Sequence, residues 1–92
     1  MEYGNFIDGK WAPSESGRTF ESLEPANGEV VGVVARSTAA DVDRAVGSAV
    51  SAFKSWRLVP APKRGEILFR VGQLLQARKE ELASLMSREM GK

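Results

Sequence analysis

The stretch Thr38-Ala39-Ala40-Asp41 decides the fold, because it divides a strand-forming part of the chain from a helix-forming part. Thr38 and Asp41 have the spacing of a capping box, in which each side chain bonds to the backbone N–H of the other residue. Asp stands at the position where Glu is usual. The sequence therefore predicts a helix that begins at Thr38.

Apolar residues follow Asp41 at alternating spacings of four and three, which places them on one stripe of a helix. Pro60 ends this helix, because the residue before a proline is displaced from helical angles. Pro62 suits the first turn of a second helix. The first stripe comprises Val42, Val46, Ala49, Phe53 and Trp56, and the second comprises Ile67, Leu68, Val71, Leu74 and Leu75.

The sequence of the last part of the chain is compatible with one long continuation of the second helix or with a third helix after a bend. Residues 76–81 are polar and interrupt the apolar face, which favours a bend near Arg78. Arg88 places positive charge near the negative end of the last helix, and Gly91 suits a left-handed cap. The apolar spacing resumes at Leu82, Leu85, Met86 and Met90.

Upstream of the capping box, the sequence predicts a small antiparallel β meander. Asp8-Gly9 accepts the positive φ angles of a type I′ hairpin turn, and residues 25–29 form a second turn. The predicted fold class is thus α+β, an antiparallel meander followed by two or three amphipathic helices. The strand regions are residues 5–11, 19–24 and 30–34, and the two parts of the chain are residues 1–36 and 37–92.

Composition sets outer limits on function. A chain of 92 residues forms one domain at most, and 42% apolar content argues against disorder. The net charge of +1 gives no electrostatic case for a nucleic acid or membrane partner. The chain has no cysteine, and its N-terminus lacks the basic start and apolar core of a signal peptide. We therefore expect a cytoplasmic protein.

Motif searches assign no catalytic, cofactor-binding or metal-binding residue. Gly91-Lys92 fails the phosphate-loop pattern, because Met86 stands where a glycine is needed. Gly28 and Gly32 lack the spacing of a dinucleotide fingerprint. Without histidine or cysteine, a zinc site would need carboxylates alone, against the preference of that metal.

Three sets of side chains deserve weighing as a site. Carboxylates on a basic helix could exchange protons, but a solvated or ion-paired face explains them better. Tryptophans could line a pocket, although core or interface packing is the commoner role. Arginines could hold a phosphate, but surface ion pairing is favoured without a glycine-rich loop. The residues are Glu80, Glu81, Glu89, Trp11, Trp56, Arg64 and Arg70.

Six short segments in register carry a family resemblance. Together they resemble the opening segment of the NAD(P)-dependent aldehyde dehydrogenase superfamily over residues 5–92. Glu24 departs from the pattern, since the family usually has asparagine before this proline, and it implies a local change in the hydrogen bonding of the turn. The segments are NFIDGKW at 5–11, EPANGEVVG at 24–32, STAADVDRAV at 37–46, AFKSWR at 52–57, RGEIL at 64–68 and EMGK at 89–92.

The resemblance implies an α/β fold for the intact family, with a Rossmann-like cofactor domain and a catalytic domain. Residues 1–36 and 37–92 then form the front of a larger cofactor-binding domain. In the family, a cysteine thiolate attacks the aldehyde, an asparagine side chain and a backbone amide hold the oxyanion, and a glutamate activates water. Those residues match no position of this chain. The resemblance implies that the intact enzyme uses NAD or NADP and that this segment alone binds no cofactor. It also implies that the 92-residue chain alone is inactive.

The resemblance also implies a structural role. The expected partner is the remainder of the same subunit, within a homo-oligomer that oxidises an aldehyde, with a semialdehyde as the first candidate. The apolar helix faces are then expected to be uncovered in this chain alone, led by Phe53, Trp56, Leu74, Leu75 and Leu85. The alternative is a freestanding interaction module that binds a partner helix in an apolar groove.

Overall fold

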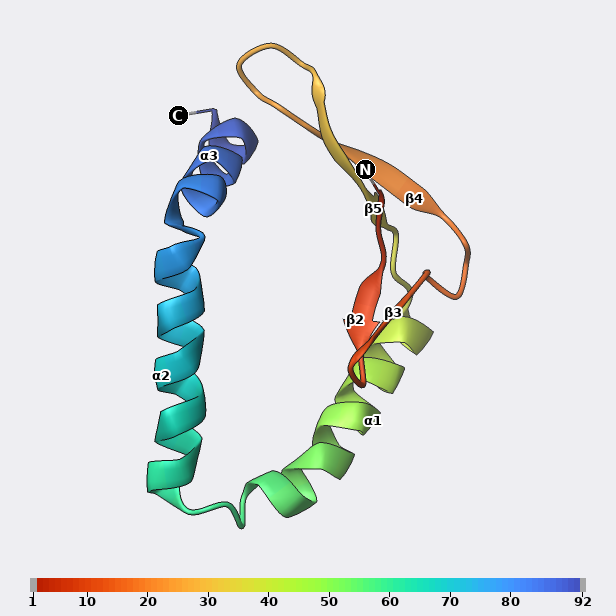
Figure 1. The fold of residues 1–92 in the computed structure, drawn as a ribbon. Helices are drawn as coiled ribbons and strands as arrows, with labels where there is room; N and C mark the ends of the chain where they lie inside the picture. Colours follow the sequence, from red (N-terminus) through yellow and green to blue (C-terminus); the bar gives the residue numbers. More distant parts are fainter. Residues whose placement is uncertain (1, 92) are drawn as a thin grey trace.

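The computed structural model describes residues 2–91, and within that range five strands precede three helices (Figure 1). The α+β class predicted from the sequence is confirmed. The strands are β1 (Glu2–Tyr3), β2 (Asn5–Ile7), β3 (Lys10–Ala12), β4 (Thr19–Leu23) and β5 (Val30–Ala35), and the helices are α1 (Ala39–Trp56), α2 (Ala61–Ala77) and α3 (Lys79–Met90).

The predicted capping box opens α1. The backbone N–H of Thr38 donates to Asp41 Oδ2 at 2.8 Å, and the N–H of Asp41 donates to Thr38 Oγ1 at 3.4 Å. Both bonds satisfy N–H groups that the first turn of a helix leaves without partners. A local sequence signal thus fixes where α1 begins.

The predicted bend between the last two helices is also confirmed. Arg78 has φ −108° and ψ 19°, which separates α2 from α3, and its guanidinium binds Glu81 at 2.8 and 3.1 Å. Gly91 ends α3 with φ 76°, the left-handed cap expected of it.

The strands form two sheets, which corrects the single antiparallel meander expected for residues 1–36. β2 and β3 form an isolated hairpin, with φ of 54° at Asp8 and 73° at Gly9. β4 and β5 are antiparallel, but β1, which the sequence analysis missed, joins β5 in parallel. The β3–β4 connection causes the separation, because Ser14 bonds to the segment ahead of α1 instead of turning β4 back along β3.

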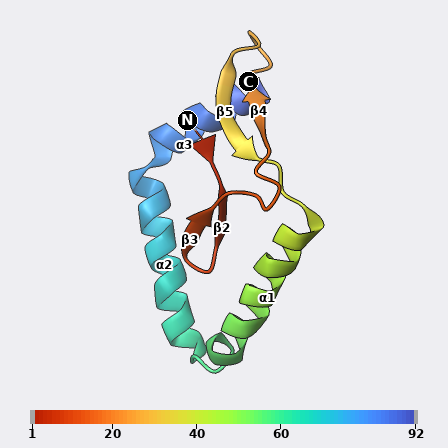
Figure 2. The same cartoon turned by 90° about the vertical axis from the view of Figure 1, so that its right-hand side faces the viewer.

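The elements lie in a single layer. The molecule measures 47 × 34 × 16 Å. Its shortest dimension is only slightly larger than the diameter of one helix, roughly 10–12 Å. Its radius of gyration is 16.7 Å, whereas a compact domain of this length has about 12 Å. Two views at right angles show α1 and α2 diverging from their short connection (Figures 1 and 2).

The last helix returns to the sheet and closes the layer into a ring (Figure 2). Arg88 Nε lies 3.6 Å from Glu24 Oε2, and Gly91 lies against Pro25 in the β4–β5 turn. The carbonyl of Glu24 also accepts from the N–H of Gly28 at 2.8 Å. Glu24, the residue that departs from the family pattern, therefore links this turn to α3.

Gly4 is expected to tolerate no side chain. A Cβ at this position would lie 2.5 Å from the carbonyl oxygen of Ala12, a backbone atom that cannot move without disturbing the β2–β3 hairpin. Gly4→Ala should therefore lower the stability of an assembly that contains this chain by about 1–3 kcal/mol.

Gly47→Ala is the matched control for this change. Nothing lies within 4 Å of the Cβ position of Gly47, so alanine there should stabilise α1 by about 1 kcal/mol. Urea-unfolding midpoints measure both variants, and equal stability of the Gly4→Ala and wild-type proteins would contradict the close approach.

Candidate functional site

The carboxylate of Asp41 forms a buried junction between three segments of the chain. Its side chain is 2% exposed and receives hydrogen bonds from the β3–β4 connection and from the first turn of α1. Ser14 Oγ donates to Oδ2 at 3.0 Å, and the N–H of Glu15 donates to Oδ1 at 3.0 Å. Arg44 Nη2 lies 2.6 Å from Oδ1. The β3–β4 connection is therefore attached to the first turn of α1.

These bonds keep Asp41 ionised. The N–H of Thr38 is the largest influence and holds the pKa of the Asp41 carboxyl well below 3.8, with further lowering by Glu15, Arg44 and Ser14 against the opposing effect of desolvation. A carboxylate with so low a pKa is a poor general base, because its affinity for a proton is small at neutral pH. We interpret Asp41 as a structural junction.

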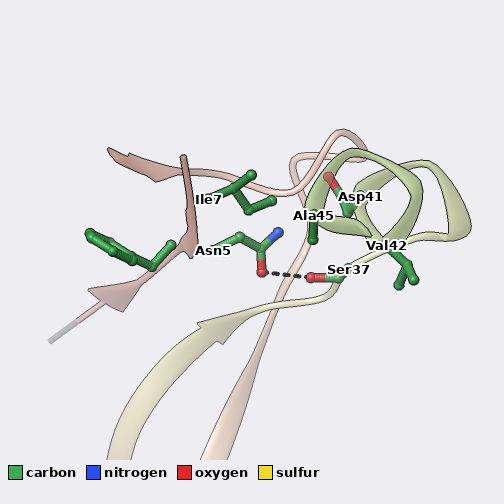
Figure 3. Close-up of a pocket in the computed structure, with 7 residues that line it drawn as sticks. Asn5, Ile7, Ser37, Asp41, Val42 and Ala45 are labelled. Atoms are coloured by element: carbon green, nitrogen blue, oxygen red, sulfur yellow. Dashed lines mark hydrogen bonds between the residues drawn. The ribbon is translucent and has the colours of Figure 1, made fainter. Parts of the chain in front are cut away.

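A small cavity of about 190 Å³ lies beside this junction, between β2 and the first turns of α1 (Figure 3). Asn5 and Ile7 line it from β2, and Ala45 lines it from α1. Ser37 Oγ donates to Asn5 Oδ1 at 2.8 Å, which attaches the hairpin to the segment ahead of α1. Asn5 Nδ2 is buried without a hydrogen-bond partner among residues 2–91. Ser37 and Asp41 also line the cavity, but the Ser37 hydroxyl donates to Asn5 and the Asp41 carboxylate is held by the donors described above.

Helix α1 has three chemically different faces. With 3.6 residues per turn, the centres of neighbouring faces lie roughly 100° or more apart around the helix axis. Small residues face the β2–β3 hairpin across an open hollow. The large apolar residues lie on the next face, and the third face is polar. The small face carries Ala45, Ser48 and Ala52, the apolar stripe carries Val42, Val46 and Phe53, and the polar face carries Asp43, Ser51 and Lys54.

The predicted apolar stripes are uncovered. Phe53 is 59% exposed, Trp56 40%, Leu74 59% and Leu85 41%, and no hydrophobic side chain in the described part of the chain is fully buried. The chain exposes 7556 Å², whereas a compact monomer of 10.0 kDa exposes about 5,200 Å². The excess of about 2,300 Å² is the surface that a second layer would cover. The exposed apolar stripes of the helices are the candidate functional site, and their chemistry is that of a packing interface.

The side chains weighed as a possible site are dispersed over the layer. Trp11 stacks edge-on against Phe6 with ring centroids 5.0 Å apart, and 67% of it is exposed. Glu81 is paired with Arg78, and hydrogen bonding from Arg78 lowers the pKa of the Glu81 carboxyl. Arg64 Nε donates to the carbonyl of Val59 at 3.1 Å.

Those residues form no cluster with the others that were weighed. Glu89 lies beside the sheet with Leu85, whereas Glu80 and Arg70 are exposed on their helices. Within residues 2–91, no three His, Cys, Asp or Glu side chains are placed to hold a metal ion, and no helix has the length and apolar character of a membrane span.

Sequence reasoning identified Asp41 as a capping residue but missed its bonds to Ser14 and Glu15. The available signal is the substitution of Asp for the usual Glu in the capping box. Ser14 and Glu15, in a polar Ser-Glu-Ser segment, are the other half of the junction, but they lie 27 and 26 residues from Asp41, which hides the pairing. The uncovered stripes, by contrast, were predicted.

Comparison with known proteins places this arrangement. Residues 11–92 match the Aldehyde dehydrogenase family. The chain is 46% identical over 88 residues to malonate-semialdehyde dehydrogenase 1 of Bacillus licheniformis. The aligned residues make up 96% of this chain and 18% of that relative.

Solved structures give the same result. The NAD-dependent aldehyde dehydrogenase from Sinorhizobium meliloti superposes with a TM-score of 0.95 at 38% identity, over 100% of this chain and 19% of that one. A putative methylmalonate-semialdehyde dehydrogenase from Sinorhizobium meliloti 1021, complexed with NAD, gives a TM-score of 0.87 at 40% identity. The superposition covers 97% of this chain and 18% of that one. The chain thus spans less than a fifth of the length of these relatives.

Proposed function

The chain belongs to the aldehyde dehydrogenase family, and we propose that it is the N-terminal structural segment of an NAD(P)-dependent enzyme that oxidises an aldehyde to a carboxylate. The observation that carries this proposal is the uncovered apolar surface of a single-layer segment. Stable domains bury such faces against a second layer. In this proposal the second layer is the remainder of the same subunit.

The segment contributes position and packing to that enzyme, and the chemistry belongs to other parts of it. The chain has no cysteine to act as the nucleophile. Asp41, the one buried carboxylate among residues 2–91, is engaged by five donor groups of four residues. NAD(P) would accept the hydride in the intact enzyme. A structural role for this segment is what these residues support.

A semialdehyde is the proposed substrate class of the intact enzyme. The support comes from relatives named malonate-semialdehyde dehydrogenases that share 46–48% identity with this segment. A freestanding interaction module, the alternative function, would need a core of its own. Among residues 2–91 no hydrophobic side chain is fully buried, which disfavours that alternative.

A chimaeric enzyme tests this function. In the chimaera, this chain replaces the 88-residue segment of the Bacillus licheniformis relative to which it aligns. We expect the chimaera to reduce NAD with malonate semialdehyde at a rate within about tenfold of the unaltered relative, a barrier change of about 1.4 kcal/mol. We expect no such activity from this chain alone. A soluble, folded chimaera without activity, or NAD reduction by the chain alone, would overturn the proposal.

A further inference from the structure

The uncovered surface has the size of a strong protein–protein interface. Obligate assemblies bury 2,000 Å² or more in total, which is about 1,000 Å² or more on each partner. The excess surface of this chain, about 2,300 Å², exceeds that amount on one partner alone. Separate chains hold together through interfaces of this area in obligate assemblies.

The segment also carries its own signals for local structure. The capping box at Thr38 begins α1, Gly91 in the left-handed conformation ends α3, and Asp8-Gly9 turns the hairpin. Asp41 then connects the β3–β4 connection to α1 through bonds made within this chain. None of these features needs a residue from another part of the enzyme. The elements are therefore specified before the second layer arrives.

From these two observations we propose that the chain assembles in trans, as a separate polypeptide, with the remaining part of an aldehyde dehydrogenase chain. The proposal rests on the proposed function and adds that no peptide bond between the two parts is required. The occupant of the apolar surface is the complementary part of the family fold, because relatives extend over five times the length that this chain matches. The two parts are present in equal numbers in the complex.

The apolar stripe of α1 is the contact that we assign to this partner. The small-residue face of α1 is already directed at the hairpin, whereas Val46 on the stripe is 55% exposed. Ser51 lies on the polar face of the same helix and is also exposed. The two positions therefore form a matched pair. Aspartate at either position adds the same negative charge to α1, but only the carboxylate of Val46→Asp would lie in the interface.

Co-expression tests the assembly. This chain, with an affinity tag, is produced together with the Bacillus licheniformis relative from which the aligned 88-residue segment has been removed. We expect recovery of a 1:1 complex that reduces NAD with malonate semialdehyde, with a dissociation constant at or below about 1 μM. Val46→Asp should weaken association at least about 100-fold, and Ser51→Asp should change it less than about threefold.

The outcomes separate this inference from the proposed function. If the covalent chimaera is active but the co-expressed parts do not associate, assembly in trans is wrong and the proposed function stands. If neither the chimaera nor the pair is active although the chimaera folds, the proposed function fails as well. Equal weakening by Val46→Asp and Ser51→Asp would show that the stripe of α1 is not the contact.

Discussion

Replacing Phe53 with Asp is expected to abolish the activity of the chimaera. Phe53 is 59% exposed in this chain, but on the present account the rest of the subunit covers it. Burying a phenylalanine contributes about 1.5–3 kcal/mol, and an unpaired carboxylate in its place adds a desolvation penalty. Soluble yield and NAD reduction measure the effect, and a loss of at least about 100-fold in active enzyme is expected.

The same substitution should act in the opposite direction on the isolated chain. There Phe53 faces water, so aspartate removes an exposed apolar group and should raise solubility without reducing helix content. Ser51→Asp, on the polar face of α1, should leave the chimaera active. A Phe53→Asp chimaera with wild-type yield and activity would mean that this face of α1 remains exposed in the enzyme.

Asp41→Ala is expected to be the most damaging substitution among the polar residues. It removes an acceptor from Ser14 and the only acceptor of the part-buried N–H groups of Glu15 and Thr38. Ser14 keeps its bond to the carbonyl of Arg36, whereas the two N–H groups lose their partner within the described residues. The loss should exceed that of Thr38→Ala, which removes only the capping hydroxyl and costs about 1 kcal/mol. Urea-unfolding midpoints of the chimaera measure both variants. Asp43→Ala, an exposed carboxylate on the polar face of the same helix, is the matched control and should have little effect.

This stabilisation by Asp41 should depend on pH. The folded-state pKa of Asp41 lies below its usual value of 3.8, chiefly because of the Thr38 N–H. A lowered folded-state pKa stabilises the protein fully above the unfolded-state pKa, and the stabilisation is lost as the pH falls toward the folded-state pKa. The difference in stability between wild type and Asp41→Ala should thus narrow below about pH 5. A difference that stays constant or widens on acidification would contradict the role of the ionised carboxylate.

Features encoded by neighbouring residues were predictable from the sequence. The start of α1 follows from Thr38 and Asp41, the bend at Arg78 follows from an interrupted apolar face, and the cap at Gly91 follows from a single glycine. The uncovered stripes were also predictable. Their periodicity marks the apolar faces, and the family resemblance implies that the remainder of the subunit covers them.

Features that depend on distant pairing were not predictable. The parallel partner of β1 is β5, which lies about thirty residues away, and a two-residue strand has no alternation to mark it. The separation of the hairpin from the second sheet depends on Ser14, whose hydroxyl lies 2.7 Å from the carbonyl of Arg36 and 3.0 Å from Asp41 Oδ2. A polar loop residue gives no sign of such a contact in the sequence.

The most direct test of the account is the behaviour of this chain in isolation, measured by analytical ultracentrifugation and calorimetry on the same sample. A single layer with about 2,300 Å² of surplus surface should associate with itself and should show no sharp cooperative transition as a monomer. A soluble monomer that melts in one sharp transition, with Phe53 and Leu74 inaccessible to solvent, would contradict it.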